Sequence, residues 1–293
     1  MAVMDAVAAD VRARMLDHLG GLPAEIGTAT ITAARSAPIV LSPAAQAAVS
    51  VVTVTYGTGP IVLECLAALA ATLAGVDAEV IVVDQPPPRS RDRALPTAAR
   101  LRLATAGVRL VVTDRNYGFG GGNTVGVAHA KAPHVVLLNP DAVVRPGWLE
   151  PLVAALDDPA VGIAAPVLLN PDGSFQEAGQ TLNRKGGTAP ITERPSTPVT
   201  EVTYASAACW ALRRAEYEQL GGFDPRYHPA YFEDVDLALR YARRELRSVV
   251  VAASEVVHHA GTGARQRTAW AAPQHAIFRA RWATELVGMA ARG

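Results

Sequence analysis

Polar residues that could hold a cation follow two apolar runs of this 293-residue chain. Asn139 and Asp141 come directly after the run 135–138, and His258 follows Val256 and Val257, beyond the strand predicted over 247–252. A carboxylate and an amide two residues apart can share a hard divalent cation such as Mg²⁺. A neutral imidazole can complete a metal site or bind a phosphate. The alternatives are an Asx turn for the first pair and a structural role for the histidine, and the residues alone leave both open.

Three carboxylates, Glu233, Asp234 and Asp236, stand at the start of a helix predicted over 234–244. Because a helix N-terminus attracts acidic side chains, we expect at least one of them to cap the helix. Carboxylates this close also repel one another, so the pKa of one can rise until that residue acts as a general base. Capping and proton transfer both remain open on this pattern.

Glycines crowd the segment 116–123, which reads Asn-Tyr-Gly-Phe-Gly-Gly-Gly-Asn. Glycine lets backbone N–H groups approach an anion or a sugar closely. The cluster is not the dinucleotide-binding fingerprint, because that motif follows the first strand of its fold and this one follows the third. The alternative to ligand binding is a tight turn from strand to helix.

Alternating strands and helices position these residues. In the first half, β-branched runs predict strands over 49–56, 79–84, 108–113 and 135–138, and helical spacing predicts helices over 61–73 and 126–130. This order is typical of an α/β fold with a parallel sheet. After residue 160 the pattern loosens, and we expect strands over 161–169, 199–212 and 247–252, helices over 213–220, 234–244 and 270–289, and a loop over 186–198. Ligands of such sheets bind beyond the carboxyl ends of the strands, where the polar residues lie.

Composition narrows the class of protein. Half the residues are hydrophobic and 18% are charged, which excludes global disorder. The 27 basic and 27 acidic residues cancel, so we expect no nucleic-acid partner. Cys65 and Cys209 are too few for a disulfide framework or a cysteine zinc site. The chain shows neither a bilayer-spanning apolar run nor a signal-peptide pattern, so we expect a cytoplasmic protein.

The two ends of the chain are predicted to lie outside the main domain, 49–263. Residues 1–48 form an extension, with a helix over 3–19 and a short strand near 30–32. Residues 264–293 form a C-terminal helix with a basic rim, which includes Arg279 and Arg281. We expect this rim to be solvated; the alternative is peripheral docking on an anionic lipid surface or on a lipid-linked acceptor.

The motifs, taken in order, resemble those of glycosyltransferase family 2, in particular its rhamnosyltransferase-type members. The resemblance covers about residues 49–263. The matching segments are 51–56, 83–84, 116–123, 137–142, 171–173, 213–214, 220–224, 233–237 and 256–261. It implies the GT-A nucleotide-sugar-binding fold, an α/β fold with a mostly parallel central sheet flanked by helices.

The resemblance also implies residue roles. Asp141 would hold Mg²⁺ or Mn²⁺ on the donor diphosphate, with His258 completing the metal site. Asp234 would be the catalytic base, beside Glu233. The donor-binding residues would be Thr55, Tyr56, Asp84, Asn116, Gly118, Gly120, Gly121, Gly122 and Asn139.

The implied activity is metal-dependent, inverting transfer of a sugar, such as the deoxyhexose rhamnose, from a nucleoside diphosphate to an acceptor hydroxyl. The acceptor would be a glycan, a lipid-linked intermediate or a small molecule. One departure matters, because members usually continue Val-Asp with Asn-Gly-Ser, whereas Gln85 and three prolines follow Asp84 here. The departure motivates the alternative of a degenerate binding or scaffold module. A sugar nucleotidyltransferase fits less well, since its glycine-rich loop follows the first strand.

Overall fold

The computed structural model describes residues 27–30, 39–42, 44, 46–86, 101–102, 104–259 and 264–288. The helix predicted over 3–19 lies outside these residues. The strands are β1 (Gly27–Thr30), β2 (Ile39–Val40), β3 (Val49–Tyr56), β4 (Ala78–Gln85), β5 (Thr105–Ala106), β6 (Arg109–Val112), β7 (His134–Leu138), β8 (Ala142–Val144), β9 (Val161–Leu169), β10 (Phe175–Glu177), β11 (Gln180–Leu182), β12 (Thr188–Pro190), β13 (Val199–Val202), β14 (Cys209–Arg213) and β15 (Arg247–His258).

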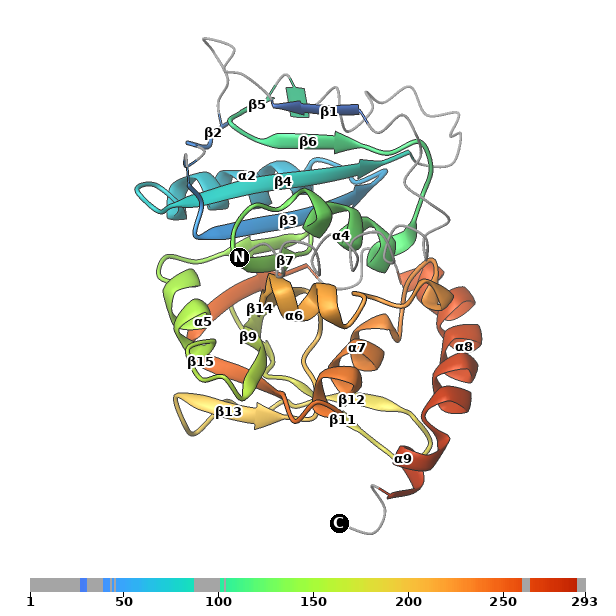
Figure 1. Cartoon of the computed structure of the whole chain (residues 1–293). Helices are drawn as coiled ribbons and strands as arrows, with labels where there is room; N and C mark the ends of the chain where they lie inside the picture. The colour runs from blue at the N-terminus through green and yellow to red at the C-terminus, as the bar shows by residue number, and fades with distance from the viewer. Residues whose placement is uncertain are drawn as a thin grey trace, which may run out of the picture.

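The helices are α2 (Ile61–Thr72), α4 (Gly118–His129), α5 (Leu149–Ala155), α6 (Arg214–Gln219), the 3₁₀ turn η1 (Pro225–Tyr227), α7 (Glu233–Ala242), α8 (Ala264–Arg281) and α9 (Ala283–Gly288). Figure 1 shows the strands stacked from β1 at the top to β13 near the bottom, with α8 running down one side. The α/β fold predicted from the sequence is confirmed.

One large sheet runs through the described part of the molecule in the order β1-β6-β4-β3-β7-β14-β9-β15-β13. The neighbours β6, β4, β3 and β7 are parallel, as the sequence predicts. The second half is different, because β14 is antiparallel to both β7 and β9, and β13 is antiparallel to β15. In addition, β9 and β15 are parallel, and β1 is antiparallel to β6. The prediction of a mostly parallel sheet therefore holds best for β6, β4, β3 and β7, and the whole sheet is mixed.

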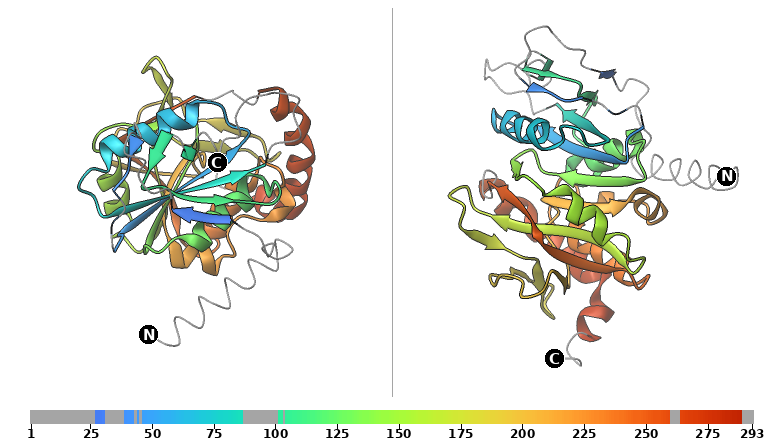
Figure 2. Two further views of the ribbon diagram at one scale, coloured as in Figure 1. Left: turned by 90° about the horizontal axis from the view of Figure 1, so that it is seen from above. Right: turned by 90° about the vertical axis from the view of Figure 1, so that its left-hand side faces the viewer.

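Strand residues alternate between two cores, one on each face of the sheet. Val52 and Val54 of β3 pack with α4, α7 and α8 on one face, whereas Val51 packs with α2 and α5 on the other. The strands are hydrophobic on both faces because helices cover both, as Figure 2 shows from two further directions. Phe278 of α8 and Trp282, between α8 and α9, belong to the first core, where they contact Phe232 and Asp236 at the start of α7.

Several secondary-structure predictions are wrong in extent. The strand expected over 247–252 runs on to His258 as β15, and the helix expected over 270–289 is the two helices α8 and α9. The run expected as one strand over 199–212 is two strands, β13 and β14, on different neighbours. The expected loop over 186–198 includes β12, which forms a hairpin with β11. The helix expected over 126–130 begins at Gly118, so the glycine cluster lies inside a helix rather than in a loop before it.

Candidate functional site

Parallel pairing places the first group of predicted donor-binding residues side by side. Thr55 of β3 lies opposite Asp84 of β4, and its hydroxyl donates to Asp84 Oδ1 over 2.6 Å. Both residues are buried. Tyr56 follows at the strand end, half-buried, where its backbone N–H donates to Thr58 Oγ1. The hydroxyl of Thr55 thus fixes the orientation of the Asp84 carboxylate at the carboxyl edge of the sheet.

Gln85, the residue that departs from the family pattern, holds the start of α4. Its Oε1 accepts from the backbone N–H of Tyr117 over 2.6 Å, and its Nε2 donates to the carbonyl oxygen of Gly118 over 3.0 Å. The side chain is buried with both ends of its amide bonded. Sequence reasoning missed this residue, because its partners lie more than 30 positions away along the chain.

The glycines of α4 allow close packing. A Cβ on Gly122 would lie 2.6 Å from Val54 Cγ1, and one on Gly126 would lie 2.2 Å from Val52 Cγ1. A Cβ on Gly120 would lie 2.7 Å from the Cβ of Phe223. These separations are shorter than van der Waals contact, so only glycine lets α4 lie this close to β3 and Phe223. Gly121 is buried in the same turn of the helix.

The segment before α7 contacts the turn that leads into α4. Asn116 Oδ1 accepts from the backbone N–H of Gly118 over 2.8 Å, and the Asn116 carbonyl oxygen lies 3.2 Å from His228 Nε2. Pro229 accepts from the N–H of Phe119 over 2.8 Å. Gly118 has φ +75, and a Cβ there would lie 2.5 Å from the Pro229 oxygen. His228 and Pro229 were not singled out from the sequence, yet they join the glycine segment to α7.

The residues of the predicted metal site converge from two distant parts of the chain. Asn139 and Asp141 lie between β7 and β8, and His258 ends β15, which pairs with β8. His258 Nε2 lies 3.7 Å from Asp141 Oδ1 and 3.5 Å from Asn139 Nδ2. The backbone N–H of His259 donates to the Asp141 carbonyl oxygen over 3.0 Å and closes the loop on the strand. We call Asn139, Asp141 and His258 the metal corner.

The metal corner has a donor set that suits a hard divalent cation. Burial lowers the pKa of His258, an effect that the Asp141 carboxylate opposes, and so favours the neutral imidazole. Asn139 Oδ1 is buried and makes no hydrogen bond to any described residue. The described residues contain no cluster of three or more His, Cys, Asp or Glu side chains that could enclose an ion. Asp141 and His258 would therefore supply only part of the ligands of an ion such as Mg²⁺ or Mn²⁺, which leaves positions for substrate phosphates, and a cation at this corner stays a prediction.

The acidic cluster at the start of α7 divides into different roles. Asp236 is fully buried and accepts from Tyr227, Trp282, Arg240 and Arg281, so it ties α7 to α8 and is structural. Burial, followed by the charge of Asp234, raises the pKa of Glu233 well above its ordinary value of 4.5.

Glu233 and Asp234 differ in exposure. One oxygen of Glu233, Oε2, is buried without a hydrogen-bond partner among the described residues. Asp234 is only half-buried, and its Oδ1 accepts from the N–H of Val235 over 2.8 Å. We call Glu233 and Asp234 the acid corner, in which Asp234 is the carboxylate that solvent reaches.

Two residues with positive φ lead into the acid corner. Tyr231 has φ 82 and Phe232 has φ 69, values that side-chain-bearing residues rarely adopt. The Phe232 ring stacks on His275 at 5.1 Å and contacts Phe278 at 5.4 Å, both in α8. Packing against α8 therefore stabilises a backbone that costs of order 1–3 kcal/mol per residue. Such outliers concentrate at functional sites.

The contacts join the predicted site residues into three groups. Thr55 pairs with Asp84; Asn116 and Gly118 join the segment before α7; and Asn139, Asp141 and His258 share the metal corner. His228 links the second group to the chain that leads to Asp234. That the metal corner and Asp234 face one bound sugar stays a prediction.

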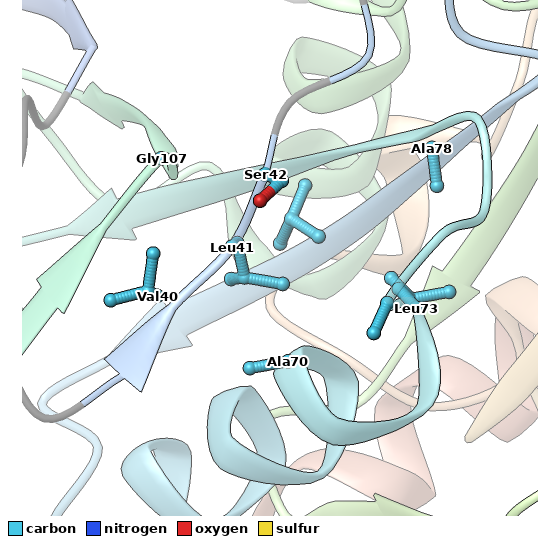
Figure 3. Close-up of a pocket in the computed structure, with 9 residues that line it drawn as sticks. Val40, Leu41, Ser42, Ala70, Leu73, Ala78 and Gly107 are labelled. Atoms are coloured by element: carbon cyan, nitrogen blue, oxygen red, sulfur yellow. The ribbon is translucent and has the colours of Figure 1, made fainter.

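A small pocket lies elsewhere, at the opposite edge of the sheet. Figure 3 shows it between β2 and the C-terminal end of α2, with Ser42 as its one polar side chain. Ala78 and Val80 line it from the start of β4, whereas Asp84 lies at the end of that strand. The pocket is therefore remote from the predicted donor site.

Comparison with known proteins shows the family and the fold of the chain. The family model "Glycosyl transferase family 2" matches residues 50–221. The chain is 33% identical over 239 residues to the N-acetylglucosaminyl-diphospho-decaprenol L-rhamnosyltransferase of Mycobacterium tuberculosis, covering 71% of this chain and 75% of the relative. It is also 33% identical over 164 residues to the O-antigen biosynthesis protein RfbC of Myxococcus xanthus, covering 52% of this chain and 13% of that protein.

Solved structures share the fold at low identity. GalNAc-T7 matches with a TM-score of 0.60 at 17% identity, over 72% of this chain and 43% of that one. The mannosyltransferase PcManGT of Pyrobaculum calidifontis matches with a TM-score of 0.53 at 18% identity, over 95% of this chain and 76% of that one. Both likenesses support the GT-A architecture. Separately, the described helices include none long and apolar enough to cross a membrane.

Proposed function

Because the chain belongs to glycosyl transferase family 2, we propose that it is a metal-dependent, inverting glycosyltransferase acting on a nucleoside diphosphate sugar. The sugar is a deoxyhexose such as rhamnose, since a rhamnosyltransferase aligns with 71% of this chain. The observation that carries the proposal is the metal corner, where Asn139, Asp141 and His258 meet although 117 residues separate Asp141 from His258.

In this proposal the metal corner binds the donor diphosphate through Mg²⁺ or Mn²⁺. Two structural relatives were solved with Mn²⁺, one with UDP and GalNAc and the other with GDP-Man. Asp141 and His258 are the protein ligands, and Asn139 lies beside them with its Nδ2 3.5 Å from His258 Nε2. The bound cation would act as a Lewis acid that stabilises the charge of the leaving diphosphate, an effect worth several kcal/mol.

The nucleoside is bound at the ends of β3 and β4. Asp84, held by Thr55, accepts from the base or ribose, and Tyr56 lines the base pocket. Asn116 and the backbone of Gly118, Gly120, Gly121 and Gly122 line the donor site. Because the side-chain directions of Gly118, Gly120 and Gly122 point into protein, they contribute only backbone atoms and close packing.

Asp234 is the catalytic base. Its half-exposed carboxylate takes the proton of the acceptor hydroxyl as that oxygen attacks the anomeric carbon. Burial and the charge of Asp234 raise the pKa of Glu233 well above its ordinary value, which favours the neutral form of Glu233 beside Asp234. Attack from the side opposite the leaving diphosphate inverts the configuration of the sugar.

The acceptor is a glycan, a small molecule or a lipid-linked intermediate, and the last follows the printed name of the M. tuberculosis relative. A lipid-linked acceptor would bring the protein into peripheral contact with the inner face of a membrane. The exposed side chain of Arg279 on α8 is available for such contact.

A panel of nucleoside diphosphates, with and without Mn²⁺, tests the proposal by thermal shift. A ligand at 100 times its dissociation constant stabilises a protein by about 2.7 kcal/mol. We expect one nucleotide to stabilise the protein in a Mn²⁺-dependent way and so to name the donor base. If no nucleoside diphosphate stabilises the protein, with or without Mn²⁺, the result would contradict the proposal and favour the scaffold alternative.

A further inference from the structure

Gln176, in β10, contacts His258 at two points. Its Nε2 donates to the backbone oxygen of His258 over 3.0 Å, and its Oε1 lies 3.1 Å from the ring atom Nδ1. Nε2 also donates to Asn170 Oδ1 over 3.0 Å. Every polar atom of the Gln176 amide is therefore engaged, and two of its three contacts are to the histidine of the metal corner.

Backbone carbonyl groups fix which way each amide points. A carbonyl oxygen only accepts, so the atom of Gln176 facing the His258 oxygen must be the NH₂ group. Asn170 Nδ2 likewise donates to the oxygen of Phe175, at 3.4 Å, and to Ser174 Oγ, which leaves Asn170 Oδ1 for Gln176. Gln176 Oε1 is then the atom that faces Nδ1 of His258.

This orientation decides which nitrogen of His258 carries the proton. Gln176 Oε1 is an acceptor, so Nδ1 must donate, and a neutral imidazole then has an unprotonated Nε2. Nε2 is the atom near Asp141 Oδ1 and Asn139 Nδ2. The lone pair of an unprotonated Nε2, next to the Asp141 carboxylate, could bind a cation that lies between the two side chains. A hydrogen on Nε2 would prevent this.

We propose that Gln176 is a positioning residue that holds His258 in the Nδ1–H tautomer, with Nε2 free to bind the divalent cation. The proposal rests on the metal role in the proposed function but concerns a separate residue. Partners of this kind orient metal-binding histidines, and their loss typically costs about 10–100-fold in metal affinity.

Three variants test the proposal. Gln176→Leu removes both contacts to His258. Gln176→Glu keeps an acceptor for Nδ1–H but loses the donor to the His258 oxygen. Gln180→Leu is the matched control, since Gln180 donates to Glu177 in the neighbouring strand. Long-range ¹H–¹⁵N spectra of the metal-free proteins report the tautomer, and His258→Asn identifies the His258 signals among those of seven histidines.

Wild type and Gln180→Leu should show protonated Nδ1 and unprotonated Nε2, and Gln176→Glu should keep that tautomer. Gln176→Leu should populate Nε2–H, and the Mn²⁺ concentration that broadens the His258 signals should rise about 10–100-fold. Protonated Nε2 in wild type, or an unchanged tautomer in folded Gln176→Leu, would overturn the proposal. If Gln176→Leu does not fold, loss of the tautomer in Gln176→Glu overturns it.

The two proposals fail in distinguishable ways. If Mn²⁺ leaves the wild-type His258 signals unchanged, the metal role of the proposed function is wrong, while the tautomer still reports whether Gln176 orients the ring. If Mn²⁺ broadens those signals equally in wild type and Gln176→Leu, the metal role stands and the role of Gln176 is overturned.

Discussion

The metal corner and the acid corner both place a carboxylate at the site, but they control it by different means. Strand pairing and hydrogen bonds hold Asp141 and His258, through the β8–β15 register and through Gln176. Burial controls the acid corner, where Glu233 has a buried oxygen without a partner and a raised pKa. The comparison teaches that hydrogen bonds orient the side chains of the metal corner, whereas burial in the acid corner raises the pKa of Glu233 beside the more exposed Asp234.

The backbone differs in the same way. The metal corner lies between regular strands, and the positive-φ non-glycine residues of the described chain do not include its members. The acid corner follows Tyr231 and Phe232, both with positive φ and held by packing on α8. The sheet thus fixes the proposed metal ligands, and a turn with positive φ presents the proposed base.

The substitution Asp234→Asn, in the acid corner, should have the largest effect, a loss of sugar transfer. The amide cannot take the acceptor proton, so we expect transfer to fall by about 10²–10⁴-fold while Mn²⁺-dependent nucleotide binding is nearly unchanged. Single-turnover rates and nucleotide titrations measure the two effects. The control is Asp172→Asn, an exposed aspartate in a turn. Full turnover in Asp234→Asn would remove the base assignment.

The substitution Asp141→Ala, in the metal corner, should instead weaken nucleotide binding, which Asp234→Asn leaves nearly unchanged. Loss of a metal ligand should weaken Mn²⁺-dependent nucleotide binding by roughly tenfold or more, about 1.4 kcal/mol or more. Binding without Mn²⁺ should change little, because Asp141 acts through the cation. Calorimetric titration with and without Mn²⁺ measures both. An unaffected affinity would count against Asp141 as a ligand.

Gly126→Ala tests the packing of α4 on β3, on which the glycine segment beside the acid corner depends. Its Cβ would lie 2.2 Å from Val52 Cγ1, so we expect a loss of about 1–3 kcal/mol in the free energy of unfolding. Gly59→Ala is the control, since a Cβ there meets no atom within 4 Å. Urea denaturation measures both variants, and equal stability would show that α4 can shift at no cost.

Glu233→Gln should have the smallest effect, confined to high pH. The folded-state pKa of Glu233 lies above 4.5, so ionisation of the wild type destabilises the fold as pH rises from 4.5 through that raised pKa. A neutral glutamine avoids the cost. We expect the variant to be more stable than wild type at high pH and equal to it below pH 4.5. A stability difference independent of pH would show that Glu233 is not held protonated.

The sequence predicts the parallel half of the sheet well, because β-branched runs such as 49–56 are long and end in polar residues. It also predicts that Asp141 and His258 come together. It does not predict the role of Gln85 or Gln176, whose partners are distant in sequence and whose side chains fit many environments. The sequence also does not predict that the glycines lie inside α4. They are needed there because α4 packs closely on β3, and this is a tertiary contact.

The most direct test is a crystal structure of the protein with Mn²⁺ and the nucleoside diphosphate that stabilises it most, with the ion located by anomalous scattering. The account predicts Mn²⁺ roughly 2–2.5 Å from an Asp141 oxygen and from His258 Nε2, bound to the diphosphate, with the Asp234 carboxylate facing the β-phosphate across the space for the sugar. An ion bound away from both ligands, or Asp234 directed away from the diphosphate, would contradict it.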